Sequence, residues 1–304
     1  MSTAQNKQQK KRKSQTPTAL VYFATLLLFL AVFGLIASFV VDKLNELNQP
    51  QQAQKADPVP SFNLFFAHVN GKNVLAEMSV VRISPETNSV VVLPVSAVVK
   101  NDSDKTFREV YDNGGIIKLK ASVEKTFGLT VDNYATVSNK AYERLVDMIG
   151  GVIYTPEEDL YYLAKNDADD ISIRSGQAIS LVGRQVRLIS QYPVFKTGKE
   201  GNQLFINEAT EQLVASAIRQ TSITKNNLDN VYNIITENSD TDWDKNIYKV
   251  HKTYIKKMLD TNDTKCQLIA PEGKWQDNKL EMSDKFMEDL KKIILDTEPA
   301  PIED

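Results

Sequence analysis

The sequence predicts a layered α/β domain that follows one N-terminal transmembrane helix. Three observations support this fold class. A charge-free apolar stretch lies near the N-terminus, a polar segment rich in Gln and Pro follows it, and the rest of the chain alternates between β-rich runs and helical periodicity. Interleaved strands and helices are typical of domains in which helices pack on a sheet. With 42% hydrophobic and 25% charged residues, the composition is that of an ordinary globular protein.

Residues 1–17 are expected to form a basic cytoplasmic tail. Five lysines and arginines and no acidic residue occur among the first thirteen positions, so 31 basic and 39 acidic residues remain for the rest of the chain. That remainder carries a net charge of −8 and would repel nucleic acid. We therefore expect no nucleic-acid partner.

Residues 18–41 are expected to form the transmembrane helix, because they contain no charged side chain. A helix of this length extends about 36 Å, enough to cross a hydrocarbon core of about 30 Å. A cleaved signal peptide is the alternative, but its apolar core is shorter, about 7 to 15 residues, and no convincing cleavage pattern precedes Asp42. Acidic residues Asp42 and Glu46 follow the span, which places the N-terminus in the cytoplasm. We expect a single-pass protein of the cell membrane with an extracytoplasmic main domain.

Residues 42–60 are expected to form a linker. They are mostly polar, and Pro50, Pro58 and Pro60 interrupt them, so they cannot bury a core. Residues 61–296 are expected to form the α/β domain. The acidic residues 297–304 include two prolines and are expected to form a disordered tail.

Within the domain, β-branched and aromatic residues predict strands at 63–69, 78–84, 90–95, 134–137, 152–154 and 267–270. Apolar spacing predicts a helix over 116–127 that ends at Gly128, and a second helix that begins at the N-cap Ser138 and ends at Gly150. Further helices are expected at 208–219, 227–235, 243–259 and 284–295. The single cysteine, Cys266, cannot form an intramolecular disulfide and is expected to be a small buried side chain.

Three segments of the chain resemble the LytR-CpsA-Psr family, whose members are anchored outside bacterial membranes. They are the strand pair Met78–Pro94, the stretch Tyr111–Leu129 with its Asp-Asn-Gly-Gly and Phe-Gly-Leu, and the segment Arg144–Val152 with its Leu-Val-Asp and Gly-Gly-Val. The likeness extends from Phe62 to about Ala217. It implies a three-layer α/β/α domain that holds a polyisoprenyl phosphate lipid between sheet and helices. It also implies Mg²⁺-dependent transfer of a lipid-linked glycopolymer onto peptidoglycan.

The charged motifs of that family are replaced in this chain. Counted without gaps, the Arg and Asp that end the family's second strand fall on Ala97 and Val98, and the two arginines after its Leu-x-Gly turn fall on Gln191 and Pro193. Phosphoryl transfer needs cations on the phosphates and carboxylates on the metal. Whether the chain is an enzyme stays open, and we lean towards no; we assign no catalytic residue and no metal ligand.

The family's metal-binding Asp falls on Ala76, with Glu77 next to it on the opposite face of the strand, so only a bulge would bring Glu77 to the site. Arg108 lies where the family's Lys-x-Asn segment passes the pocket, and it contacts either a phosphate or a surface carboxylate. Arg184 and Arg187 could offer displaced guanidinium groups, although solvated side chains around a turn are the simpler interpretation. Our candidate ligand-binding residues are Arg108, Glu77 and Arg187.

Other polar residues have structural interpretations. Asp147 is expected to cap or orient local structure, and the acidic loop 157–170 to be solvated, since it lacks the ligand pattern of a calcium-binding loop. His68 and His251 are expected to be core or surface residues and not metal ligands. No cofactor is expected, and Mg²⁺ enters only if the chain is an active enzyme.

The preferred hypothesis is a catalytically degenerate member of the family that serves cell-wall polymer assembly at the cell envelope. Its partners would be the lipid bilayer, through residues 18–41, and a polyisoprenyl phosphate lipid or a cell-wall assembly protein. One alternative is an active phosphotransferase whose site is rebuilt from Glu77, Arg108 and Arg187. A third hypothesis is a purely structural envelope protein whose pocket has collapsed.

Overall fold

The computed structural model describes residues 59–166, 169–237, 239–261 and 263–297. The predicted basic tail, the predicted transmembrane helix 18–41, the linker up to residue 58 and the tail from residue 298 lie outside these residues. No helix in the described ranges is long and apolar enough to cross a membrane.

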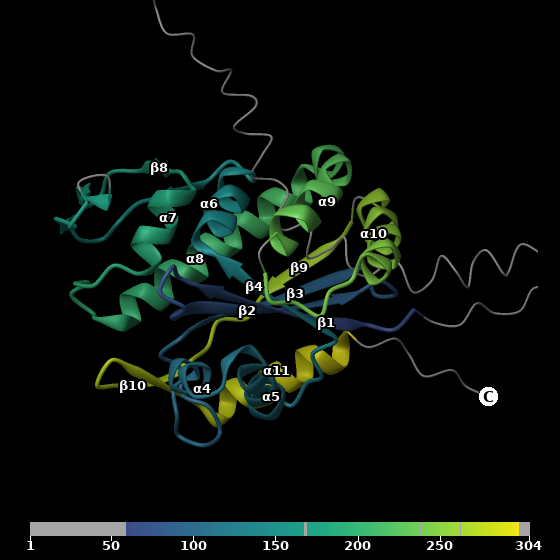
Figure 1. Ribbon diagram of the computed structural model, residues 1–304, viewed down its shortest axis with the longest axis horizontal. Helices are drawn as coiled ribbons and strands as arrows, with labels where there is room; N and C mark the ends of the chain where they lie inside the picture. The colour runs from purple at the N-terminus through teal and green to yellow at the C-terminus, as the bar shows by residue number, and fades with distance from the viewer. Residues whose placement is uncertain (1–58, 167–168, 238, 262, 298–304) are drawn as a thin grey trace, which may run out of the picture.

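A mixed five-stranded sheet forms the centre of the fold, in the strand order β4-β1-β2-β3-β9 (Figure 1). The strands are β1 (Phe62–Val69), β2 (Leu75–Ser84), β3 (Ser89–Ser96), β4 (Asn133–Ser138) and β9 (Lys265–Leu268). β1, β2 and β3 form antiparallel pairs, whereas β4 and β9 pair in parallel with β1 and β3. Every residue of β1 and β3 is buried, because helices cover both faces of the sheet.

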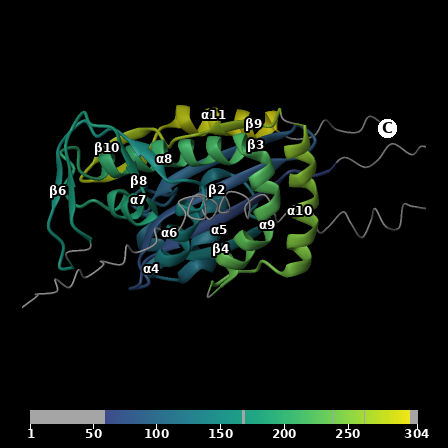
Figure 2. The same ribbon diagram turned by 90° about the horizontal axis from the view of Figure 1, so that it is seen from above.

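The upper layer in Figure 1 consists of α6 (Asn139–Asp147), α7 (Gly183–Ser190), α8 (Lys199–Arg219), α9 (Thr221–Thr236) and α10 (Lys245–Asp260). Seen from above in Figure 2, these helices overlie the strands. Leu64, Val81 and Val92 of the sheet share a core with Leu145 and Leu213 of this layer. Two short antiparallel pairs extend the layer: β5 (Val152–Tyr154) with β8 (Ile179–Leu181), and β6 (Leu160–Tyr162) with β7 (Ile171–Ile173).

The lower layer consists of α4 (Phe107–Asp112), α5 (Gly115–Phe127), α11 (Asp284–Asp296) and the hairpin of β10 (Gly273–Gln276) and β11 (Lys279–Met282). Phe65, Val80 and Leu93 of the sheet pack there with Leu119 and Phe127 of α5. Successive residues of each strand therefore feed two separate cores, one on each face. The prediction of an α/β domain with helices packed on a sheet is confirmed.

Two helix ends lie where the sequence predicts them, whereas α6 ends at Asp147 and not at the predicted Gly150. Ser138 begins α6, since its hydroxyl accepts a hydrogen bond from the Ala141 N–H at 3.2 Å. Gly128 ends α5 with a φ of 66°, a left-handed conformation that glycine adopts without steric cost. The last predicted strand is also present, but it begins earlier, at Lys265.

Four predictions need correction, and one of them is α9, which begins at Thr221 and not at 227. α7 occupies the segment in which we expected a turn with solvated Arg184 and Arg187. α8 begins at Lys199, well before the predicted start at 208. Cys266 is exposed, not buried, because it lies on β9, a four-residue strand at the edge of the sheet.

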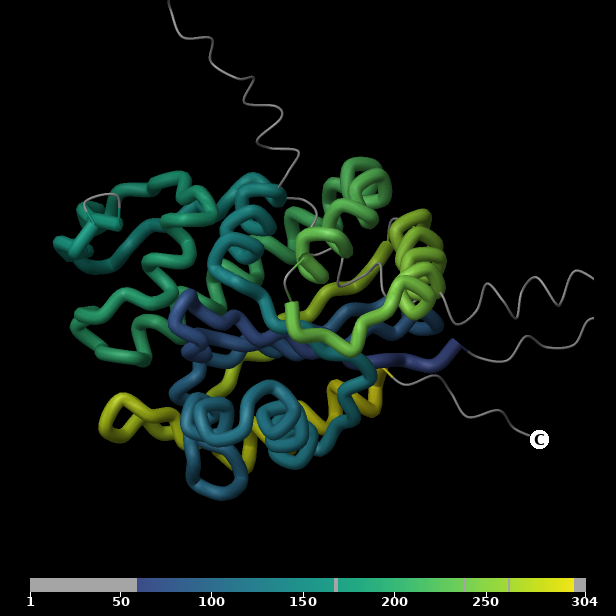
Figure 3. Tube along the Cα trace, in the orientation of Figure 1, coloured from purple at the N-terminus to yellow at the C-terminus, as the bar shows by residue number. Residues whose placement is uncertain are grey.

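The two ends of the described domain lie together. The Ser61 hydroxyl donates to the Thr297 carbonyl oxygen at 2.8 Å, and Arg82 Nε donates to the Thr297 hydroxyl at 2.8 Å. Figure 3 shows the start of β1 in purple and the end of α11 in yellow on the same side of the molecule. The chain therefore enters and leaves the described fold at neighbouring points.

Candidate functional site

An apolar cavity, which we call the sheet cavity, lies between the sheet and helices α6 and α8. Its apolar walls include Phe66, Val81 and Val92 from the strands and Val146, Ile206 and Leu213 from the helices. It leaves about 80 Å³ for the centres of water-sized molecules, which is room for several waters or for part of a slim apolar chain.

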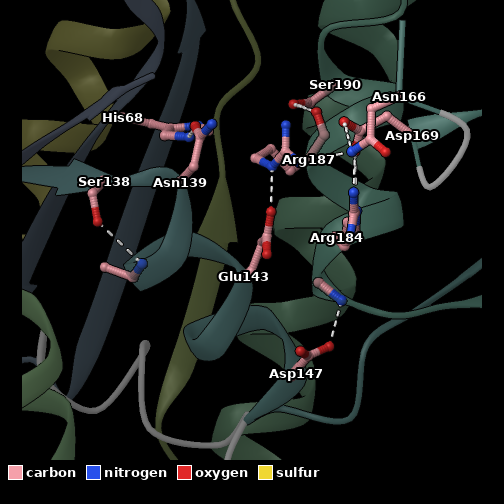
Figure 4. A network of polar contacts seen from close by, with 12 residues as sticks. His68, Ser138, Asn139, Glu143, Asp147, Asn166, Asp169, Arg184, Arg187 and Ser190 are labelled. Atoms are coloured by element: carbon pink, nitrogen blue, oxygen red, sulfur yellow. Dashed lines mark hydrogen bonds and ion pairs between the residues drawn. The ribbon is translucent and has the colours of Figure 1, made fainter. Parts of the chain in front are cut away.

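His68, Glu77 and Tyr142 are polar residues of the sheet-cavity lining, and Asn139 contacts one of them from outside it. His68 Nδ1 lies 3.1 Å from Glu77 Oε1. On the other side of the ring, His68 Nε2 lies 2.9 Å from Asn139 Oδ1 (Figure 4). The Tyr142 ring stacks on the His68 ring with 4.3 Å between centroids. Burial, followed by the nearby Glu77 carboxylate, raises the pKa of Tyr142 well above its usual value. A buried carboxylate therefore stands in a mainly apolar cavity.

A β-bulge lies next to Glu77 in β2. His68 pairs with Glu77 while Val69 pairs with Leu75, so Ala76 is an extra residue in the ladder. Because of this extra residue, Leu75 and Met78 both pack in the lower core, and Glu77 between them lines the sheet cavity above. The bulge does not bring Glu77 to the position of Ala76, because Glu77 lines the sheet cavity whereas Ala76 lines a separate cavity.

A second cavity, the cationic cavity, is lined by three of the positions at which the family's charged motifs fall, Ala76, Val98 and Gln191. It is lined by Asn70, Ala76, Ser96, Val98, Arg108, Ser190, Gln191, Lys199 and Asn202. It leaves about 150 Å³ for water-sized molecules. Within the described part of the chain its lining includes two cationic residues and no carboxylate, so it attracts anions but offers no carboxylate ligand of the kind that Mg²⁺ prefers.

Two polar nitrogens of the cationic cavity are unsatisfied. Arg108 Nε and Gln191 Nε2 are buried without a hydrogen-bond partner among the described residues. Burial, with the positive charge of Arg108 in addition, lowers the pKa of Lys199. An anion in this cavity would accept hydrogen bonds from the unpaired donors and offset both charges.

Helix α4 positions Arg108. The Thr106 hydroxyl accepts from the Glu109 N–H at 3.2 Å, and the Glu109 carboxylate accepts from the Thr106 N–H at 2.7 Å. The Arg108 N–H donates to the Ala97 carbonyl oxygen at 2.9 Å, which ties the helix to the end of β3. The sequence carries the signal for this helix start, since Thr and Glu three residues apart form a capping box, although no helix was predicted here.

Arg187 is held by carboxylates. Its Nε donates to Glu143 of α6, its Nη2 lies 3.7 Å from Asp169, and its side chain is 13% exposed. Arg184 bonds the same Asp169 at 2.7 Å. Figure 4 shows both arginines of α7 facing these acceptors. Arg187 would have to break its ion pairs to reach a ligand.

Asp147 positions the start of α7. Its carboxylate accepts a hydrogen bond from the Gly183 N–H there, so the prediction that it caps or orients structure is confirmed. Asn139, Glu143 and Asp147 stand four residues apart on α6 and share one face of the helix. This face joins α6 to β1 and to α7 (Figure 4).

The structure does not gather our three candidate ligand residues. Glu77 lines the sheet cavity, Arg108 lines the cationic cavity, and Arg187 is paired with Glu143 and Asp169. Lys199 was not among the predicted site residues, because the family pattern directs attention to arginines and no helix was expected to begin there.

The other candidate residues have structural roles within the described ranges. His68 and His251 are both buried, and burial lowers the pKa of His251 well below its usual value. Asp159 of the acidic loop accepts from the Ser175 N–H at 2.7 Å. No group of three or more His, Cys, Asp or Glu side chains that could hold a metal occurs among the described residues.

Comparison with known proteins gives a family match and several similar structures. The sequence model of the LytR_cpsA_psr family matches residues 80–294. A protein of Eubacterium siraeum has 18% identity and a TM-score of 0.63 over 82% of this chain and 98% of its own. Bacillus subtilis TagV has 15% identity and a TM-score of 0.58 over 78% and 96%. TagT bound to LI-WTA has 12% identity and a TM-score of 0.57 over 81% and 94%. At these identities the likeness shows the fold. No curated protein matches.

Proposed function

This chain belongs to the LytR-CpsA-Psr family, and from that premise we propose that it serves cell-wall glycopolymer assembly as a lipid-binding subunit without phosphotransferase activity. One observation carries the proposal. Ala76, Val98 and Gln191, at the positions of the family's charged motifs, line one cavity whose only charged lining residues in the described structure are Arg108 and Lys199.

The chemistry of phosphoryl transfer argues against catalysis at this cavity. The transferred group needs metal ions held by carboxylates and cations placed on its oxygens. Arg108 and Lys199 supply positive charge, but the lining described here has no carboxylate to hold Mg²⁺. Loss of a single stabilising group typically costs about two to three orders of magnitude in rate, so this cavity would bind an anion without transferring it.

The sheet cavity supports the lipid-binding part of the proposal. It is bounded by strands and helices with mainly apolar side chains, as a site for an apolar chain requires. The open volume argues against a purely structural protein with a collapsed pocket. TagT, a protein of similar fold, has been solved bound to LI-WTA, so this fold is compatible with uptake of a ligand.

We propose further that residues 18–41 anchor the chain in the cell membrane with the N-terminus in the cytoplasm. The charge distribution around this segment supports the orientation. The domain would then lie outside the membrane, close to lipid-linked precursors. Its partners would be the bilayer, a polyisoprenyl-type lipid and proteins of cell-wall assembly.

The proposal is tested with the full chain in phospholipid nanodiscs. We expect no release of phosphate from a lipid pyrophosphate analogue with Mg²⁺ or Mn²⁺, while a photoactivatable isoprenoid probe labels the chain saturably. A catalytically active family member serves as the positive control for turnover. Metal-dependent turnover that Arg108→Ala abolishes would instead establish the active phosphotransferase, and absence of saturable labelling would rule out lipid binding.

A further inference from the structure

Helix α10 presents a row of lysines to solvent. Lys245, Lys249, Lys252 and Lys256 follow one another at intervals of four, three and four residues, so they share one face of a helix with about 3.6 residues per turn. Three of them are exposed and Lys252 is partly exposed. We call this face the lysine stripe. The other face of α10 packs in the upper core.

Most of the positive charge of the lysine stripe has no local partner. Among the described residues, Lys245, Lys249 and Lys256 make no ion pair, and Lys252 pairs with Asp229 at 2.6 Å. By contrast, two lysines of α11 share a single aspartate of the same helix. The stripe therefore differs from a surface on which charges of both signs are balanced.

The acidic residues at the two ends of α10 are already engaged. The Asp244 carboxylate accepts from the Asn246 and Ile247 N–H groups at 2.6 and 2.9 Å, which caps the helix. Asp260 pairs with Lys225 of α9. Beyond the first thirteen positions the chain has 31 basic and 39 acidic residues, so the stripe is a local excess of positive charge on an acidic protein.

The stripe lies at the end of the domain at which the described chain begins. Phe62 at the start of β1 stacks on His251 of α10 with 4.9 Å between ring centroids. Figure 2 shows α10 as the outermost helix at this end of the molecule. The predicted linker contributes 17 residues between the predicted transmembrane helix and Val59, and a flexible chain of this length spans about 20–25 Å.

We propose that the lysine stripe of α10 docks on a bilayer surface that contains anionic phospholipid. The proposal rests on the membrane anchor proposed for residues 18–41, and it adds the orientation of the domain on the membrane. Each lysine near an anionic surface strengthens association about fivefold, and the short tether keeps lipid phosphates at a high effective concentration beside this end. The acidic remainder of the domain is repelled by the same surface, which turns α10 towards the bilayer.

The experiment places a fluorophore beside the stripe of the full chain in nanodiscs. In a Cys266→Ser background, the label is attached to Thr253→Cys, an exposed position of α10, and a spin-labelled phosphatidylcholine head group quenches it on close approach. We expect about threefold more quenching with about 30% phosphatidylglycerol than with phosphatidylcholine alone, because only the first surface is negatively charged. An increase from about 0.05 M to about 0.5 M salt should abolish this difference, because salt screens exposed charges.

A double variant tests the unpaired lysines themselves. Lys249→Gln with Lys256→Gln should lower the quenching in anionic nanodiscs by more than half, because two of the three unpaired charges are removed. Lys72→Gln with Lys118→Gln is the matched control. It removes the same charge from two exposed lysines that make no ion pair among the described residues, and it should leave the quenching unchanged.

The outcomes separate this orientation from the anchor. Equal quenching in both kinds of nanodisc, or an equal loss in the two double variants, would overturn docking through the stripe while the anchor stands. A label on Ser103→Cys, in the loop before α4, that is quenched as strongly as the label on α10 would overturn it too. A chain that nanodiscs of phosphatidylcholine do not retain would end both proposals.

A soluble anionic polymer is the other occupant that the stripe could take. If soluble polyphosphate changes the emission of the label on α10 while anionic nanodiscs do not quench it, the stripe binds a polymer and membrane docking is wrong. The comparison of lipid compositions uses the unaltered stripe, so it decides the question even if a double variant fails to fold.

Discussion

The positive charge of Lys199 destabilises the folded state, and a substitution should reveal this effect. Burial and the charge of Arg108 lower its pKa from the usual 10.5, so the unfolded chain binds this proton more tightly than the folded one. The cost to folding is complete at pH values below the folded pKa and disappears as the pH rises from there towards 10.5.

We therefore expect Lys199→Met to raise the free energy of unfolding at pH 7 by about 0.5–1 kcal/mol. Urea unfolding of the full chain in detergent measures the change. Lys196→Met, at an exposed lysine nearby, is the control and should stay within about 0.5 kcal/mol of wild type. An equal gain from both variants would show that burial of Lys199 is not the cause.

A substitution at Arg187 tests whether this arginine has a structural role or binds a ligand. Its ion pairs with Glu143 and Asp169 join α6, α7 and the segment before α7. We expect Arg187→Gln to destabilise the domain by about 1–2 kcal/mol, since it leaves the partly buried Glu143 carboxylate without its ion pair, while Asp169 keeps Arg184. Saturable labelling of the chain by the isoprenoid probe should not change. Arg184→Gln, at a side chain that is 41% exposed, should cost less, and a loss of labelling with unchanged stability would restore Arg187 as a ligand residue.

The helix pair α6 and α7 depends on a close backbone approach at Gly183. A Cβ atom at this position would lie 2.1 Å from the Glu143 carbonyl oxygen, so the helices would have to separate. We expect Gly183→Ala to lower the free energy of unfolding by about 2–3 kcal/mol, measured by urea unfolding. Gly71→Ala, where a Cβ meets nothing within 4 Å, is the control, and a comparable loss there would contradict the explanation.

The capping box of α4 should make the domain sensitive to acid. Hydrogen bonds from Thr106, together with Lys279, lower the pKa of Glu109 from 4.5 to about 2. Because the folded pKa is lowered, the stabilisation is complete above pH 4.5 and is lost as the pH falls towards 2.

Glu109→Gln should accordingly reduce stability at pH 7 by about 0.5–1 kcal/mol, a small value because the site is exposed to solvent. The difference from wild type should shrink between pH 4.5 and 2, as followed by urea unfolding at each pH. Thr106→Ser keeps the cap and is the control. A constant difference over this range would exclude ionisation of Glu109 as the cause.

Among the helices and strands, the sequence predicts those that are long and have a clear hydrophobic period. The predicted strands up to Val95 are present, as are the helix that ends at Gly128 and the helix that begins at Ser138. In these segments the spacing of the apolar residues and the capping residues indicate the same structure. α4 and α7 were not predicted, since six and eight residues are too short for a periodic signal. The sequence could not predict the bulge at Ala76. The bulge depends on the packing of both Leu75 and Met78 below the sheet, which is a tertiary contact.

For the candidate site, the sequence predicted that the charged motifs are replaced, and it could not predict how the replacements meet. Ala76, Val98 and Gln191 come from β2, from the segment after β3 and from the end of α7, and only the tertiary fold brings them together. The same fold separates Glu77 from Arg108 and adds Lys199.

The orientation of the whole molecule in the membrane can be measured by labelling introduced cysteines, because the chain has only one native cysteine to replace. In a Cys266→Ser background, we expect Ser103→Cys, on an exposed loop of the domain, to react in intact cells with a membrane-impermeant maleimide. Ser14→Cys in the basic tail should react only after the cells are lysed. Labelling of both cysteines, or of Ser14→Cys alone, in intact cells would contradict an extracytoplasmic domain on a cytoplasmic tail.

The position of β1 has a mechanical consequence. The linker joins the domain at the start of this strand, and β1 is paired along its length with β4 on one side and β2 on the other. A force pulling the linker along the strand would load both ladders in shear, so many hydrogen bonds would have to fail together. The domain would thus resist traction applied through its N-terminal end.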